Sequence, residues 1–169
     1  MFVGKNVNLR IMEKEDLSLV KEWDNEVGIM GEYEPIIQET QADLERQYDK
    51  LTEGQWFGIE KKDGTKIGLI AHFLSSGRTA IGYALLPNER GKGYGSEAIK
   101  IMIDYLFLSK NIVRIQAETH PRNMASQRVL EKAGFRKEGI VRKSFFSRGE
   151  WRDAALFSIL RDEWKEPGT

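Results

Sequence analysis

A glycine-rich turn between an apolar run and an amphipathic helix constrains this chain of 169 residues more than any other feature. Residues 79–86 read as a strand, and residues 96–108 repeat apolar side chains at helical spacing. The turn between them contains Arg90, Gly91, Lys92, Gly93, Tyr94, Gly95 and Ser96. The first N–H groups of a helix lack internal partners, the helix dipole is positive at that end, and glycines let an anion approach the backbone. The pattern therefore predicts an anion site suited to a pyrophosphate.

The glycine spacing excludes two common phosphate-binding motifs. A Walker loop needs Gly-x-x-x-x-Gly-Lys-Ser/Thr, and the Rossmann fingerprint needs Gly-x-Gly-x-x-Gly. Here the glycines stand at positions 91, 93 and 95, and Gly-Tyr follows Gly-Lys where a magnesium-binding hydroxyl would be needed. Taken alone, the spacing leaves an ordinary flexible turn with solubilising charges as the alternative.

Hydrophobic periodicity predicts an α/β chain, in the α+β sense, built on one mixed sheet. Strands are expected at 7–11, 56–60, 67–73, 79–86, 113–119 and 151–160, and helices at 16–23, 41–51, 96–108 and 123–133. Lys-Asp-Gly-Thr at 62–65 indicates a hairpin turn. Because neither an internal repeat nor a low-complexity linker divides the chain, a single domain over residues 1–169 is expected.

Charge and composition narrow the function classes. Lys plus Arg and Asp plus Glu each number 26, so no net positive field favours nucleic acid or an anionic membrane as a partner. The chain has no cysteine, which excludes disulfides, a cysteine nucleophile and a thiolate metal site. With only two histidines, His72 and His120, we also expect no metal cofactor.

The N-terminal residues and the apolar runs bear on where the protein is found. No apolar segment follows Met1-Phe2-Val3-Gly4-Lys5, so a secretory signal is not expected. No apolar run approaches the ~20 residues that a membrane span needs. We therefore expect a cytoplasmic protein.

A second motif joins the glycine turn and makes the chain resemble the GNAT superfamily of N-acetyltransferases. The coenzyme A loop of that family has the pattern Arg/Gln-x-x-Gly-x-Gly/Ala, which residues 90–95 match. Its second element, Asn-x-x-Ala/Ser-x-x-x-Tyr/Leu-Glu-x-x-Gly-Phe, is matched by Asn123, Ser126, Leu130, Glu131, Gly134 and Phe135. Residues 138–142 and 151–153 look like the ribosomal-protein N-terminal (alanine/serine) acetyltransferase branch, whose members often form homodimers, although the sequence shows no clear interface.

The resemblance implies a fold and an acetyl-CoA site. The expected fold is GNAT-like: one mixed, mostly antiparallel sheet with helices on both faces, and a fourth strand (79–86) that carries a bulge and splays from the fifth (113–119). Residues 79–135 would hold acetyl-CoA. Main-chain groups near Leu85 and Leu86 would contact pantetheine, the turn from Arg90 to Ser96 would hold the pyrophosphate, and Asn123 would contact the pantetheine arm.

The reaction needs a neutral amine, a polarised thioester and a protonated leaving sulfur. An α-amine has a pKa of about 8 and a lysine-type amine about 10.4, so deprotonation at pH 7 costs roughly 1 against roughly 4.6 kcal/mol. A peptide N-terminus therefore makes the lighter demand on a base. Glu118, five residues before Asn123, is the candidate base through a water, because some family members place a glutamate there. A solvated strand-end glutamate is the alternative, and His120 is a second candidate.

The proton donor to the leaving thiolate is less clear from the sequence. Many relatives place a tyrosine on the helix after Asn123, but this chain has Val129 and Leu130 there. Ser126 is the candidate to hydrogen-bond the sulfur, as proposed for the ribosomal-protein branch, unless it is simply a small polar residue on a helix face. Tyr94 and Tyr83 are weaker alternatives.

Charge is divided unevenly along the chain. From Glu22 to Glu45 there are eight acidic residues and no Lys or Arg, and from Lys132 to Arg152 there are seven basic residues against two acidic ones. In the resembled fold the helices at about 13–51 form a lip over the acceptor site, so an acidic lip predicts a cationic acceptor. The basic stretch would face the coenzyme A phosphates, and both stretches have solvated faces as the alternative. Aromatic candidates for the acceptor pocket, unless they serve the core, are Trp23, Tyr33 and Trp56.

Together these features predict an acetyl-CoA-dependent N-acetyltransferase that transfers the acetyl group directly in a ternary complex. The favoured acceptor is a protein or peptide N-terminal amine. The alternatives are a small amine, such as a polyamine or an aminoglycoside-like compound, and, from a different class, a non-catalytic coenzyme A sensor.

Overall fold

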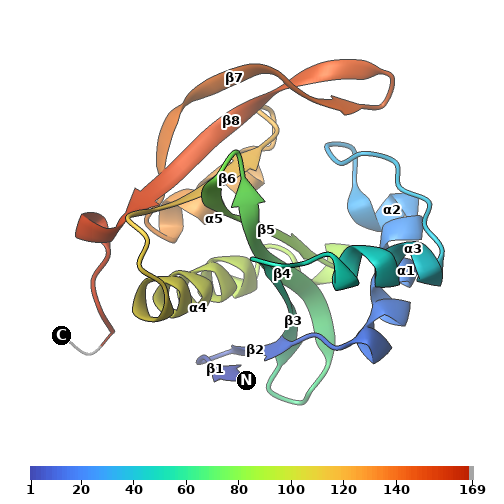
Figure 1. The fold of residues 1–169 in the computed structure, drawn as a ribbon, viewed down its shortest axis with the longest axis horizontal. Coiled ribbons are helices and arrows are strands. Elements are labelled where there is room, and N and C mark those ends of the chain that lie inside the picture. The colour runs from blue at the N-terminus through green and yellow to red at the C-terminus, as the bar shows by residue number, and fades with distance from the viewer. Residues whose placement is uncertain (168–169) are drawn as a thin grey trace.

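The computed structural model describes residues 1–167, and within them a single eight-stranded sheet carries the fold (Figure 1). The strand order is β1-β2-β3-β4-β5-β6-β8-β7. The strands are β1 Phe2–Val3, β2 Val7–Ile11, β3 Gln55–Lys61, β4 Lys66–Ser75, β5 Arg78–Leu85, β6 Arg114–Thr119, β7 Arg136–Ser147 and β8 Glu150–Leu160. Every neighbouring pair is antiparallel except β5 and β6, which are parallel. The expected mixed, mostly antiparallel sheet is thus confirmed.

The helices lie on both faces of this sheet. They are α1 Leu17–Asn25, α2 Val27–Met30, α3 Gln41–Asp49, α4 Tyr94–Ser109 and α5 Met124–Lys132, with 3-10 turns at Lys14–Asp16, Pro87–Glu89 and Arg161–Glu163. The four expected helices are present, with ends that differ from the predicted ends by one or two residues. Asn123 caps α5 as expected, since its Oδ1 accepts a hydrogen bond from Ser126 N–H at 3.1 Å.

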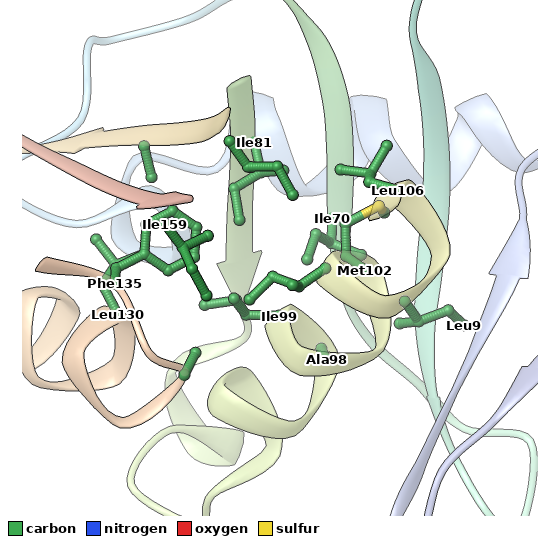
Figure 2. Packing of buried hydrophobic residues seen from close by; sticks show 14 of the residues in the cluster. Leu9, Ile70, Ile81, Ala98, Ile99, Met102, Leu106, Leu130, Phe135 and Ile159 are labelled. Carbon is green, nitrogen blue, oxygen red and sulfur yellow. The ribbon is translucent and has the colours of Figure 1, made fainter. Parts of the chain in front are cut away.

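The main core lies between α4 and one face of the sheet. Ile99, Met102 and Leu106 of α4 point at Leu9, Ile70 and Ile81 of the strands (Figure 2), and all six are at most 3% exposed. On the opposite face, Leu17 and Val20 of α1 and Leu44 of α3 form a second cluster against Trp56 and Leu69. The alternation of side chains along β3 and β4 produces the two faces, because neighbours in a strand point to opposite sides.

The sheet opens between β5 and β6, as expected for the fourth and fifth predicted strands. β4 and β5 stay paired from Ser75 opposite Arg78 to Gly68 opposite Leu85. By contrast, β5 meets β6 at a single pair, Ala80 opposite Gln116. The expected bulge in β5 is wrong for its pairing with β4, which runs without a register shift. β5 therefore separates from β6 while remaining fully paired to β4.

Three elements had no predicted bounds: the short β1, the four-residue α2, and β7. β7 is the edge strand of the sheet and is exposed along most of its length, so it has no apolar alternation to detect. Its register with β8 also shifts twice, between Lys137 and Gly139 and between Val141 and Phe145.

Among residues 1–167, no helix has both the length and the apolar character that crossing a bilayer requires.

One polar side chain in the core, that of His72, makes the stability of the folded protein depend on pH. His72 is 3% exposed, its ring lies against those of Phe57 and Tyr105, and its Nε2 has no hydrogen-bond partner among the described residues. Burial lowers the pKa of His72 from 6.5 to about 4. Between these values the unfolded chain binds a proton that the folded chain rejects, so stability is complete above pH 6.5 and falls as the pH drops toward 4.

We expect His72→Leu to remove this acid sensitivity. Denaturant unfolding at pH 7.5 and 4.5 should show the wild type losing about 2.5 kcal/mol more than the variant over this interval. An equal loss in the two proteins would show that His72 titrates normally in the folded state.

Candidate active site

The turn that the sequence predicts to bind an anion lies at the start of α4. Gly91 and Gly93 have φ values of 75° and 84°, in the left-handed region that favours glycine, and a Cβ at either position would meet nothing within 4 Å. The first intrahelical bond near this end runs from Glu97 N–H to the Gly93 carbonyl at 3.2 Å. The amides of Tyr94, Gly95 and Ser96 therefore precede any intrahelical acceptor. Open space in front of free helix-start amides fits a pyrophosphate.

The two basic side chains of the turn are engaged with the protein itself. Lys92 Nζ pairs with Glu89 Oε2 at 3.0 Å, and Glu89 also pairs with Lys61. Arg90 donates from Nε to the Leu85 carbonyl at 2.9 Å and from a terminal nitrogen to the Ile29 carbonyl at 2.8 Å. Arg90 therefore joins the end of β5 to the residues around α2, a role that the sequence did not suggest.

At the end of β5, some main-chain N–H and C=O groups bond to β4 and the others face the opening. Leu86 N–H donates to the Ile67 carbonyl at 2.9 Å, so this donor is already used. Because main-chain groups alternate along an antiparallel strand, those of Tyr83 and Leu85 face away from β4, toward the side where β6 has departed. Of the two predicted pantetheine contacts, Leu85 has its main chain on the open side.

Asn123, Ser126 and Tyr83 meet across this opening. Asn123 holds the first turn of α5 through the Ser126 amide, and the Ser126 hydroxyl lies 2.7 Å from the Tyr83 hydroxyl. The Tyr83 hydroxyl also donates to the Ser126 carbonyl at 3.3 Å. Burial raises the pKa of Tyr83, the hydrogen bond between its hydroxyl and that of Ser126 opposes the rise, and the charge of Glu34 adds to it. Tyr83 on β5 and Ser126 on α5 thus span the gap between the diverging strands.

The predicted base, Glu118, lies elsewhere on the opening. It is the second-last residue of β6 and has an exposed side chain, and its Oε2 accepts a hydrogen bond from Ser144 Oγ of β7 at 3.2 Å. No contact joins it to Ser126 or Tyr83 among the described residues. Glu34, which the sequence did not single out, is the carboxylate whose charge reaches Tyr83. Although Glu34 is exposed as a residue, desolvation by the protein around its carboxyl raises its pKa, and the charge of Arg90 opposes the rise.

His120 is poorly placed to gain a proton. Its Nδ1 accepts from Arg122 N–H at 3.1 Å, and its Nε2 lies 3.2 Å from a terminal nitrogen of Arg152. Its ring also stacks against Tyr33, with 4.8 Å between ring centres. Burial lowers the pKa of His120, and the charges of Arg152 and Arg122 lower it further. An imidazolium here would face two arginines, which argues against His120 as a base.

The acidic lip contains carboxylates without cationic partners. Burial raises the pKa of Asp24 to about 6, and the charge of Glu39 adds to the rise. Asn25 holds Glu39 through paired main-chain hydrogen bonds of 2.7 and 2.9 Å. Among residues 1–167, none of Asp24, Glu34 and Glu39 makes an ion pair. The charge of Arg90 acts on Glu34, whereas no ion pair of the described residues neutralises Asp24 or Glu39.

Of the predicted pocket aromatics, two serve the core. Trp23 is 8% exposed, and Trp56 packs against the second core cluster and the edge of Tyr48. Tyr33 stands in the loop after α2 and stacks on His120.

One residue of the basic stretch, Arg148, lies beside the acceptor lip, whereas the expectation that the stretch faces the coenzyme A phosphates stays a prediction. The hairpin of β7 and β8 extends to the side of the molecule that carries α1, α2 and α3 (Figure 1). At its turn, Arg148 donates to the Gly31 carbonyl at 2.8 Å and the Glu34 carbonyl at 3.2 Å. A shallow hollow of about 310 Å³ on the same hairpin includes His120, Lys143 and Arg152 in its wall.

Comparison with known proteins agrees with this geometry. Residues 6–136 match the family model described as an acetyltransferase (GNAT) domain. The chain is 34% identical to the probable N-acetyltransferase YjcK of Bacillus subtilis (strain 168), over 96% of this chain and 98% of that protein.

Two solved structures share the fold at a TM-score of 0.82 and 26% identity. One is spermidine N-acetyltransferase from Vibrio cholerae in complex with CoA and spermine, covering 95% of this chain and 98% of the other. The second is ribosomal-protein-S5-alanine acetyltransferase from Vibrio fischeri, covering 97% and 98%. With its opened sheet, its glycine turn at the start of α4 and a family match over most of its length, the chain belongs to the GNAT family of acetyltransferases.

Proposed function

We propose that this acetyltransferase acts on a primary amine whose molecule carries at least one further positive charge. The observation that carries the proposal is the set of unpaired carboxylates Asp24, Glu34 and Glu39. The reacting amine must be neutral when it attacks the thioester, so at that moment it has no charge of its own to pair with the carboxylates of the lip. A second cationic group would remain charged and stay paired with the lip during the reaction.

The favoured acceptor is the N-terminal amine of a basic peptide or protein, because an α-amine loses its proton at about pH 8. A small polyamine is the second candidate, since its inner or distal amines would pair with the same carboxylates. The two solved relatives that act on spermidine and on a ribosomal protein have the same fold at the same identity, so they support both candidates equally.

In the proposed division of the chain, residues 79–135 hold acetyl-CoA and residues 13–51 form the acceptor lip. The amides from Gly91 to Ser96 would bind the pyrophosphate, and Leu85 and Asn123 would flank the pantetheine arm. The general base is a separate part of the proposal. Glu118 is the proposed base and would act through a water, because its carboxylate is exposed near the end of β6. Glu34 is the second base candidate, because its charge reaches Tyr83. Either group would take the proton that the amine releases as its nitrogen attacks the thioester carbon.

Thiol release from acetyl-CoA tests the acceptor. The panel contains a basic peptide with a free Ala or Ser N-terminus, its N-terminally blocked form, a neutral peptide and spermidine. Because the chain has no cysteine, every thiol detected comes from coenzyme A. We expect turnover with the free basic peptide that disappears on blocking. Turnover with spermidine alone would support the second candidate, and turnover with the neutral peptide at an equal rate would contradict the role of the lip.

The turn of α4 offers a closely matched pair of variants for acetyl-CoA binding. Gly93 and Gly64 have φ values of 84° and 85°, and a Cβ added at either position would meet no atom within 4 Å. Alanine at either position adds backbone strain of roughly 1–2 kcal/mol. Gly93→Ala also changes the positions of the helix-start amides, whereas Gly64 lies in the remote β3–β4 turn.

We therefore expect similar losses of thermal stability in the two variants but an increase of about tenfold in the Kd for coenzyme A in Gly93→Ala only, measured by calorimetry. Unchanged affinity in Gly93→Ala would remove the turn from the proposed site.

Asp24 links acceptor recognition to stability. Its raised pKa means that ionisation disfavours the folded state, so Asp24→Asn should stabilise the protein above pH 6 and have no effect below pH 4. Partial exposure reduces the gain to on the order of 1 kcal/mol. We also expect the KM for the cationic acceptor to rise severalfold. Glu22→Gln, which removes an exposed charge from the same helix, is the control for net charge. Equal kinetic effects in the two variants would mean that only the overall field matters.

A further inference from the structure

The helix α5 cannot supply the tyrosine acid that the resemblance places seven residues after Asn123. Leu130 occupies the position where many relatives have a tyrosine, and it is 0% exposed in the main core. A leaving thiolate still has to be protonated, so another group must be the proton source. At the opening between β5 and β6, Tyr83 of β5 contacts α5 through its hydroxyl group.

We propose that Tyr83 is the proton source for the leaving sulfur and that the Ser126 hydroxyl passes the proton on. The inference rests on the proposed acetyl transfer at this site. Its geometric basis is the 2.7 Å contact between the two hydroxyl oxygens, which joins β5 to α5 across the gap where β5 has left β6. The Tyr83 hydroxyl has one hydrogen, and either oxygen can be the donor in the 2.7 Å contact. When Tyr83 gives its hydrogen to Ser126 Oγ, in place of the longer 3.3 Å bond to the Ser126 carbonyl, the hydrogen of Ser126 is free to point into the opening.

Neither hydroxyl performs the step well alone. A serine hydroxyl does not ionise in the range of side-chain pKa values, so Ser126 gives up its proton only if another arrives at its oxygen. Tyrosine ionises near pH 10 and a thiol near 8.5, and burial keeps the pKa of Tyr83 above its ordinary value. Tyr83 therefore stays protonated throughout the working pH range, ready to donate.

The step balances without a further reactant. The amine nitrogen forms its bond to the thioester carbon, and the carbon–sulfur bond breaks with its electron pair going to sulfur. The Ser126 proton moves to the sulfur as the Tyr83 proton moves to the Ser126 oxygen. The carboxylate base takes the proton that the amine nitrogen releases and then passes it through water to the Tyr83 oxygen, so both the base and Tyr83 recover their starting protonation states. The products are the acetylated amine and coenzyme A with its thiol.

The same contact could serve only to fix α5 against β5, so the test separates chemistry from support. The variants are Tyr83→Phe, Ser126→Ala, their double variant and Ser126→Thr, which keeps the hydroxyl. Tyr105→Phe is the control: Tyr105 packs in the core against Phe2 and Phe57, remote from α5.

We expect Tyr83→Phe and Ser126→Ala each to lower kcat about 100-fold with little change in the KM for acetyl-CoA. The double variant should fall no further than the poorer single variant, because the two hydroxyls act in series. Ser126→Thr should recover most of the rate, and Tyr105→Phe should match the wild type. A kcat for Tyr83→Phe within about threefold of the wild type, or losses that multiply in the double variant, would overturn the relay.

A second readout needs no acceptor. The pKa of the thiol of bound coenzyme A can be followed by NMR of an isotope-labelled methylene beside the sulfur. If the two hydroxyls donate toward the sulfur, they stabilise the thiolate, and its pKa should rise by about one unit in Tyr83→Phe. Coenzyme A bound with the same thiol pKa in both proteins would overturn the relay alone. Failure of the wild type to bind coenzyme A would overturn the proposed function, and the relay with it.

Discussion

The separation of β5 from β6 is the constraint on which the rest of the site depends. A parallel pair that meets only at Ala80 and Gln116 leaves the far half of β5 with main-chain groups that face no strand. The full pairing of β5 with β4, and α4 packed beneath both, keep this open edge in place. α4 follows the carboxyl end of β5 and α5 follows the carboxyl end of β6. Because these two strands are parallel, both helices begin at the same end of the opening, where the strands diverge. The pairing geometry of one strand thus positions both an anion site and a pair of hydroxyls.

Two arginines connect this opening to the acceptor lip. Arg90 joins the Leu85 carbonyl to that of Ile29, and Arg148 reaches the carbonyls of Gly31 and Glu34 from the β7–β8 hairpin. The segment after α2 has no regular secondary structure through which to satisfy these carbonyls. Guanidinium groups suit the task, since each offers several donors in a fixed plane. The position of Glu34 near Tyr83 therefore depends on contacts from both the cofactor side and the hairpin.

The sequence predicts the parts of this site that are local. The glycines at 91 and 93, the cap at Asn123 and the buried faces of α4 and β5 follow from backbone conformation, capping and periodicity over a few residues. Contacts between distant segments leave no such pattern. Tyr83 and Ser126 are 43 positions apart and Arg148 and Gly31 are 117 apart, and neither pair has a periodicity or motif of its own. The strand β7 was not predicted because an edge strand that is exposed on both faces needs no alternation of apolar and polar residues.

The distribution of unpaired charge suggests how binding and catalysis are divided. The basic groups near the opening, Arg90, Lys92 and Arg148, are held by carbonyls or carboxylates of the chain, whereas Asp24 and Glu39 repel each other without a cation between them. Natural proteins tend to keep such destabilising clusters where a ligand relieves them, at the expense of stability in the free state. A cationic acceptor would relieve the repulsion through its non-reacting charge. Binding energy would then come from groups remote from the thioester, while the hydroxyls at the opening act only on the reacting atoms.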